Sequence, residues 1–160
     1  MNLRNPLSWL SLGFGSGLSP IAPGTMGSLV ALIVYYLFFN SLAVSLTNIF
    51  IFLIFIIISF LIGIYIYPKT VKKDDDPSSF VWDEFVGMWV ACLPLSYIGS
   101  SFQLLLISFL LFRLFDILKP LGIRAFDKGH GAFNVMIDDV IAGVYSAVSI
   151  IFLFTFFNYI

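Results

Sequence analysis

The run Val81-Trp82-Asp83-Glu84-Phe85-Val86-Gly87 sets two adjacent carboxylates inside an otherwise apolar segment. A second run of the same pattern, Met136-Ile137-Asp138-Asp139-Val140-Ile141-Ala142, follows later in the chain. In each run two apolar residues precede the two acids, and two apolar residues and a small one follow them, at the entrance to a helical apolar segment. An ionised carboxylate in apolar surroundings is costly unless it is paired, hydrogen-bonded or metal-bound. The two runs therefore predict a shared site for a divalent metal ion.

The composition of the chain predicts a membrane protein. Of its 160 residues, 60% are hydrophobic and 11% are charged, and the mean hydropathy is +1.04, which is unusual for a soluble domain. Five apolar runs are expected to form membrane-embedded helices, at 26–39, 49–67, 85–98, 102–118 and 140–159. The first and third are shorter than the ~20 residues that a spanning helix needs, so they could be tilted or re-entrant. We expect an all-α, polytopic membrane protein, a single domain over residues 1–160, with a glycine-rich N-terminal loop.

The placement of charge predicts the orientation of the chain in the membrane. The loops after the first and third apolar runs carry no charge, so all eight Lys and Arg residues and all nine acids fall at the other ends. Since positively charged loops tend to stay in the cytoplasm, the N-terminus and the charged segments are predicted to be cytoplasmic, with the C-terminus outside. Any chemistry is expected at that face. The net charge of −1 argues against binding of nucleic acid, which favours a basic protein.

Residues 13–29 contain five glycines and two prolines. Such a stretch cannot be a spanning helix, and its flexibility would allow backbone N–H groups to approach a ligand. Thr25 is the expected N-cap of the helix that follows, and a helix N-terminus offers free N–H donors to phosphate. Gly24, Thr25 and Ser28 are therefore candidate phosphate-binding residues. The alternative is an ordinary Gly/Pro loop that caps a helix.

The first acidic pair is expected in the first turns of the third helix, capped by a serine at 78–79. The helix dipole favours acids there, which is a purely structural explanation for one exposed acid. It does not account for both Asp83 and Glu84 between aromatic residues, nor for the matching second pair. The small residue Gly87 on the Asp83 side would let another helix come close, and 142–143 do the same beside the second pair.

The end of the fourth apolar run carries three charged residues at three-residue spacing. Arg113, Asp116 and Lys119 share one face of a helix that Pro120 should end. This pattern could be a structural ion pair of Asp116 with either cation. Beside two acidic pairs, however, it favours a cationic clamp for an anionic oxygen group, because arginine binds phosphate through its bidentate fork and lysine as a point charge.

Together these parts predict phosphoryl chemistry on a phosphorylated lipid headgroup that enters from the bilayer. An all-oxygen ligand set selects Mg²⁺, Mn²⁺ or Ca²⁺. A metal, cationic side chains and a helix N-terminus are what phosphoryl transfer uses to stabilise developing charge. Two other functions would also use acids at a membrane interface: a small cation transporter or channel, and a metal-dependent phosphotransferase, whose Asp-Gly-x-x-Ala-Arg signature is missing from the chain.

The chain closely resembles the phosphatidylglycerophosphatase A family from about Asn5 to Ala147. Four ordered blocks carry this resemblance: 13–29, 81–89, 112–120 and 136–143. It implies a multi-pass enzyme of the bacterial inner membrane that uses Mg²⁺ to dephosphorylate phosphatidylglycerophosphate to phosphatidylglycerol. One departure is Gly131-Ala132-Phe133-Asn134, where the family often has Gly-Gly-x-Gly; it concerns a backbone contact and not the carboxylates.

The residues and the resemblance together lead to a hypothesis for the site. The expected ligands of one or two Mg²⁺ ions are Asp83, Glu84, Asp138 and Asp139. Asp116 is a further catalytic candidate that either completes the ligand set or orients Arg113. The metal would polarise the phosphate and activate a water that attacks phosphorus, while Arg113, Lys119 and the segment around Thr25 hold the phosphate oxygens. His130 is a candidate proton donor to the leaving group; a phosphoenzyme and the oligomeric state are left open.

Overall fold

A computed structural model describes residues 4–40, 46–71, 77–120 and 131–158. In chain order its elements are α1 (Pro6–Ser11), η1 (Gly13–Leu18), α2 (Pro23–Phe38), α3 (Leu46–Thr70), η2 (Pro77–Ser79), α4 (Trp82–Cys92), α5 (Leu95–Ile98), α6 (Phe102–Leu118) and α8 (Ala132–Asn158). The two η elements are short 3₁₀ helices. Every regular element within the described residues is helical, which confirms the predicted all-α class there.

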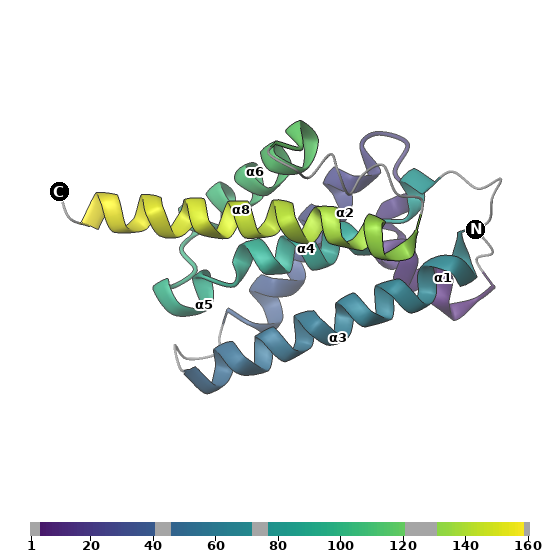
Figure 1. The fold of residues 1–160 in the computed structure, drawn as a ribbon, viewed down its shortest axis with the longest axis horizontal. Helices are drawn as coiled ribbons and strands as arrows, with labels where there is room; N and C mark the ends of the chain where they lie inside the picture. Colours follow the sequence, from purple (N-terminus) through teal and green to yellow (C-terminus); the bar gives the residue numbers. More distant parts are fainter. Residues whose placement is uncertain (1–3, 41–45, 72–76, 121–130, 159–160) are drawn as a thin grey trace.

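The short helix α4 lies at the centre of the fold. It packs against α2, α3, α6 and α8, and Figure 1 shows it between the two long helices α8 and α3. Its two tryptophans tie it to its neighbours: the Trp82 indole N–H donates to the Ser59 carbonyl of α3 at 2.9 Å, and the Trp89 indole N–H donates to the Ala31 carbonyl of α2 at 3.0 Å. Because a helix with apolar residues on all sides is stable when buried on all sides, the run around Asp83 forms the core of this protein.

Two helices, and not five, are long and apolar enough to cross a membrane within the described residues. They are α3 and α8, and only 28% and 22% of their apolar windows are buried inside the protein. The expectation of five spans was wrong for the others. The helices α2, α4 and α6 have 16, 11 and 17 residues, against the ~20 that a span needs. The run 85–98 is divided where α4 ends at Cys92, because Pro94 supplies no N–H to continue the helix.

The glycine-rich stretch is partly helical, with non-helical backbone at Phe14 (φ 57°) and Gly15 (φ 102°), so the expectation of a loop holds for only part of it. It contains η1, and α2 starts at Pro23 with Ala22 as its N-cap (φ 48°), so Thr25 lies inside the first turn. Proline suits this first helical position because its missing N–H would be unpaired there anyway. Several of the glycines pack against the start of α4: a Cβ on Gly27 would come within 2.9 Å of the Val81 Cβ. These glycines allow close packing, which explains their number without a ligand.

The start of α4 also differs from the expectation. Its N-cap is Val81, which makes no side-chain capping bond, and Ser78 and Ser79 belong to η2 instead. The Val81 backbone N–H donates to the Ser11 carbonyl at 2.9 Å, so the chain enters α4 through a contact with the end of α1. This contact sets Asp83 and Glu84 in the first turn of a buried helix.

Candidate functional site

Three carboxylates from two helices meet where α4 and α8 cross. Asp83 and Glu84 come from the first turn of α4, and Asp139 comes from α8. One oxygen of each lies within 4.8 Å of the others. Three carboxylate oxygens at this spacing could hold one metal ion. The sequence pattern predicted that the two acidic pairs share a site, and three of their four members come together in the structure.

The crossing of α4 and α8 depends on two glycines. A Cβ on Gly143 would run into the backbone carbonyl of Gly87 and would approach the Val90 Cβ to 2.9 Å. A Cβ on Gly87 would approach the Asp139 carbonyl oxygen to 2.6 Å. The helices therefore touch backbone to backbone one turn away from the carboxylates, as the small residues beside each acidic pair predicted.

The acidic cluster is enclosed by protein and short of positive charge. Burial raises the pKa of the Asp83 carboxyl well above its ordinary range, and the charge of the adjacent Glu84 raises it further. Burial also raises the pKa of Glu84. The Oε2 atom of Glu84 is buried and has no hydrogen-bond partner in the part of the chain that the structure describes. A buried acceptor in that state is costly, so this cluster is suited to a cation.

Arg113 stands beside the cluster at the end of α6. Its Nη1 atom pairs with the Asp116 carboxylate at 2.8 Å and donates to the Ser28 hydroxyl at 3.2 Å. The Ser28 hydroxyl donates in turn to the Gly24 carbonyl at 2.8 Å. The Nε atom of Arg113 is buried and has no partner among the described residues. The guanidinium is thus held in place by two neighbours and keeps one buried donor for a ligand.

The first turn of α2 completes this corner of the site. Gly24 lies directly against the Glu84 carboxylate, and a Cβ there would also come within 3.5 Å of the Arg113 guanidinium. The positive end of the α2 dipole therefore faces an acid and an arginine that are already close together. Of the three candidate phosphate-binding residues, Gly24 lies against the cluster and Ser28 bonds to Arg113 beside it, whereas Thr25 makes no side-chain hydrogen bond to either within the described residues.

Asp138 is engaged differently from its neighbour Asp139. Its Oδ2 atom accepts from the Lys119 ammonium at 2.8 Å, and its Oδ1 atom accepts the Asp139 backbone N–H at 3.0 Å. Lys119 is the C-cap of α6 in the left-handed conformation (φ 44°), just before Pro120, as the sequence predicted for the helix end. The turn directs its side chain to α8. Asp138 therefore lies in an ion pair at the edge of the cluster and outside the group of three.

Asp116 connects the two parts of the site. It pairs with Arg113 and lies close enough to Asp139 to interact with it electrostatically. The predicted ion pair of Asp116 with Arg113 is confirmed, whereas the cationic clamp for an anionic oxygen group stays a prediction. His130 lies outside the described residues, so its predicted role as a proton donor stays a prediction.

The chemistry of this donor set fits a hard divalent cation. The ligand atoms are all carboxylate oxygens, as Mg²⁺ and Ca²⁺ prefer, with no cysteine or histidine among the three. The orphaned Glu84 Oε2 atom is a buried acceptor that such an ion would satisfy. Among the described residues, Asp83, Glu84 and Asp139 form no ion pair.

We expect the metal-free protein to lose stability as the pH rises. Because burial raises the pKa of Asp83 above the ordinary value of 3.8, the folded state binds its proton more tightly than the unfolded chain. This contribution is fully present below pH 3.8 and is lost as the pH passes through the raised value. Thermal unfolding in a chelator, measured across a pH series in detergent, checks the prediction. Asp83→Asn should flatten the profile, and an unchanged slope in that variant would contradict it.

Comparison with known proteins identifies relatives along most of the chain. The sequence profile of a family described as phosphatidylglycerophosphatase A matches residues 9–154. A phosphatidylglycerophosphatase A of Escherichia coli (strain K12) is 41% identical over 150 residues, which cover 92% of this chain and 83% of the relative. One of Haemophilus influenzae is 44% identical over 153 residues, covering 92% and 88%. No solved structure matches significantly.

A third relative bears a different name. It comes from Bacteroides thetaiotaomicron, is 38% identical over 145 residues, and covers 88% of this chain and 89% of its own length. Its provisional name is phosphatidylinositol-3-phosphatase. All three relatives are thus named as phosphatases of a phosphorylated lipid headgroup. The headgroup named for the third relative differs from that named for the first two.

Proposed function

The chain belongs to the phosphatidylglycerophosphatase A family, a family of lipid phosphatases, and from this premise we propose that it converts phosphatidylglycerophosphate to phosphatidylglycerol and inorganic phosphate with Mg²⁺ as cofactor. The observation that carries the proposal is the meeting of Asp83, Glu84 and Asp139 within 4.8 Å, beside an arginine whose buried Nε–H has no partner among the residues that the structure describes. Phosphate hydrolysis requires positive charge around the phosphate oxygens and a positioned nucleophile. The cluster can provide the first through a metal and Arg113.

Asp83, Glu84 and Asp139 are the residues that would hold Mg²⁺. When bound, the ion supplies positive charge to the phosphate oxygens and makes water more acidic. Asp138 was also expected as a ligand; its ion pair with Lys119 favours a role in holding that lysine beside the site instead. The all-carboxylate donor set and the orphaned Glu84 oxygen support this assignment.

The chain's own cations would bind and orient the phosphate. Arg113 offers its Nε–H, while Asp116 and Ser28 fix the plane of the guanidinium. The α2 N-terminus near Gly24 adds backbone N–H donors, which favour anions. Hydrolysis then forms a bond from a water oxygen to the terminal phosphorus and breaks the ester bond between that phosphorus and the headgroup glycerol, whose oxygen gains a proton from the attacking water. In this scheme Asp116 is a positioning residue that acts through Arg113.

The proposal also includes an inner-membrane location for a single domain over residues 1–160. The long apolar helices α3 and α8 would span the bilayer, and their low burial within the protein supports this. Arg113 and Lys119 at the end of α6 lie beside the site, so the tendency of positive charge to stay inside favours a cytoplasmic N-terminus and active site. A site at that face would meet the headgroup of a lipid that is already in the membrane.

Phosphate release from purified lipids tests the function directly. We expect the protein in detergent to release phosphate from phosphatidylglycerophosphate when Mg²⁺ is present and to stop when a chelator removes the ion. Phosphatidic acid and phosphatidylinositol 3-phosphate, assayed in parallel, measure the breadth of headgroup recognition, which the name of the third relative makes relevant.

A cation transporter or channel remains the alternative for the acidic cluster. It would move Mg²⁺ into sealed vesicles without releasing phosphate from any of the three lipids. That result, with folded protein, would replace the phosphatase proposal. The acids favour an enzyme because they gather at one crossing and the apolar helix α3 carries no acid within the described residues.

A further inference from the structure

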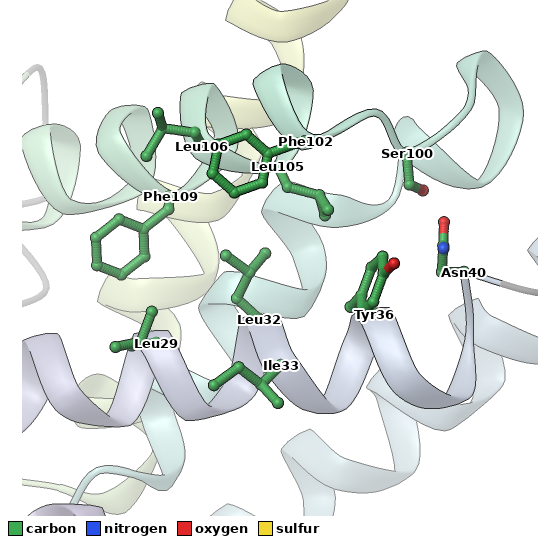
Figure 2. Close-up of a pocket in the computed structure, with 10 residues that line it drawn as sticks. All are labelled: Leu29, Leu32, Ile33, Tyr36, Asn40, Ser100, Phe102, Leu105, Leu106 and Phe109. Carbon is green, nitrogen blue, oxygen red and sulfur yellow. The ribbon is translucent and has the colours of Figure 1, made fainter.

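An apolar pocket of 620 Å³ lies between α2 and α6. Figure 2 shows that the two helices run side by side there, with Leu29, Leu32 and Tyr36 on one wall and Leu105, Leu106 and Phe109 on the other. We call this space the α2–α6 groove. Several of its side chains are accessible, since Leu29 is 38% exposed and Leu106 is 45% exposed. It is thus a groove with an accessible apolar lining, unlike the closed core around α4.

One end of the groove lies beside the proposed phosphate site. Leu29 follows Ser28, which accepts a hydrogen bond from Arg113, and Phe109 precedes Arg113 by one helical turn on α6. Leu29 and Phe109 face each other at this end of the groove (Figure 2). The headgroup glycerol and the inner phosphodiester of the substrate link its terminal phosphate to its acyl chains, so a lipid whose terminal phosphate is bound at Arg113 could place an acyl chain in the groove.

The other end of the groove is polar. The length of the groove between its two ends matches that of a fatty acyl chain. Asn40 and Ser100 line that end (Figure 2), and the Ser100 hydroxyl lies 3.1 Å from the Tyr35 hydroxyl. Eleven residues separate Leu29 from Asn40. At the rise of an α-helix, and counting the two residues beyond the end of α2 as helical, they span about 16 Å. Half of the ~30 Å hydrocarbon core of a bilayer is about 15 Å, which is the depth that the acyl chains of one leaflet fill.

We propose that the α2–α6 groove binds one acyl chain of the lipid substrate while its phosphate lies at Arg113. This inference rests on the proposed function and adds to it a recognition site for the lipid tail. The position of the groove favours an acyl chain of the substrate as its occupant, because a lipid whose headgroup is bound at Arg113 brings its acyl chains to the open end of the groove.

Filling the groove tests this proposal. Leu32→Trp and Leu106→Trp each place a bulky ring in the groove, one from each wall. Leu37→Trp and Leu110→Trp are matched controls on the same helices, because these leucines are 63% and 56% exposed and do not line the groove. The measurement is kcat/KM for phosphate release in detergent from two lipids with the same headgroup, one with long and one with short acyl chains.

We expect both groove variants to lower the long-chain to short-chain ratio of kcat/KM by about tenfold, roughly the effect of removing two methylene groups from an apolar site. The controls should keep the wild-type ratio. Retained short-chain activity would show that the variants are folded. An unchanged ratio in both groove variants overturns the acyl-chain site, whether or not the total rate falls. Absence of phosphate release from both lipids by the wild-type protein would instead contradict the proposed function itself.

Discussion

Replacing Asp139 with Asn should lower phosphate release by roughly a thousandfold, because an amide cannot replace a charged metal ligand at the centre of the cluster. The side chain keeps its shape, so the fold should survive. In the absence of metal the variant should be at least as stable as the wild type, because one of several crowded buried carboxylates has been removed. The assay is metal-dependent phosphate release, accompanied by thermal unfolding with and without Mg²⁺.

The neighbouring residue provides a matched control for this change. Asp138→Asn makes the same chemical substitution one position away, in a carboxylate that pairs with Lys119 at 2.8 Å. If Asp138 only holds the lysine, activity should fall by about tenfold and stabilisation by Mg²⁺ should remain. Mg²⁺ should no longer stabilise Asp139→Asn. Equal losses of activity and of metal stabilisation in the two variants would contradict the three-carboxylate centre and favour all four acids as ligands.

A single methyl group at Gly143 should damage both stability and activity. Alanine normally favours a helix over glycine by about 1 kcal/mol. Here its Cβ would run into the Gly87 backbone carbonyl, which cannot rotate away. Overpacking of this kind costs about 1–3 kcal/mol, so we expect a lower unfolding temperature despite the better helix propensity. Moving α8 by ~1 Å would also displace Asp139 from its partners and reduce turnover by roughly a hundredfold.

The control for Gly143→Ala is Gly131→Ala, just before the same helix. A Cβ there would meet nothing within 4 Å, so stability and activity should stay near those of the wild type. The comparison is made by thermal unfolding and by phosphate release at saturating Mg²⁺. A Gly143→Ala protein with wild-type activity would show that the close crossing of α4 and α8 is unimportant for the site.

Three of the four paired acids could be assigned to one site from the sequence because burying them is so unfavourable. Two pairs of carboxylates in apolar runs, each beside a small residue, leave few physical explanations besides a metal held between closely packed helices. The position of Pro120 likewise predicted the end of α6 at Leu118. These features depend on residues close together in sequence, or on the free-energy cost of burying a charge, which applies wherever the segment lies in the fold.

The number of spans and the partner of each charge could not be obtained in this way. An apolar run looks the same whether it crosses a bilayer or forms a buried helix of 11 residues such as α4. The packing glycines around Val81 likewise resembled a flexible ligand-binding loop, because sequence does not show which surface approaches a residue without a side chain. The lining of the α2–α6 groove had no signal of its own, since its leucines and phenylalanines match those of the lipid-facing surface.

The sequence by itself determined that this chain is helical, apolar and built around acidic pairs that require compensation. These properties follow from local composition and from the energetic cost of burying charge. Only the tertiary structure decided that Asp139 joins Asp83 and Glu84 while Asp138 pairs with Lys119. Adjacent residues on a helix point about 100° apart, so the way α8 crosses α4 at Gly87 and Gly143 decides which of two identical side chains enters the cluster.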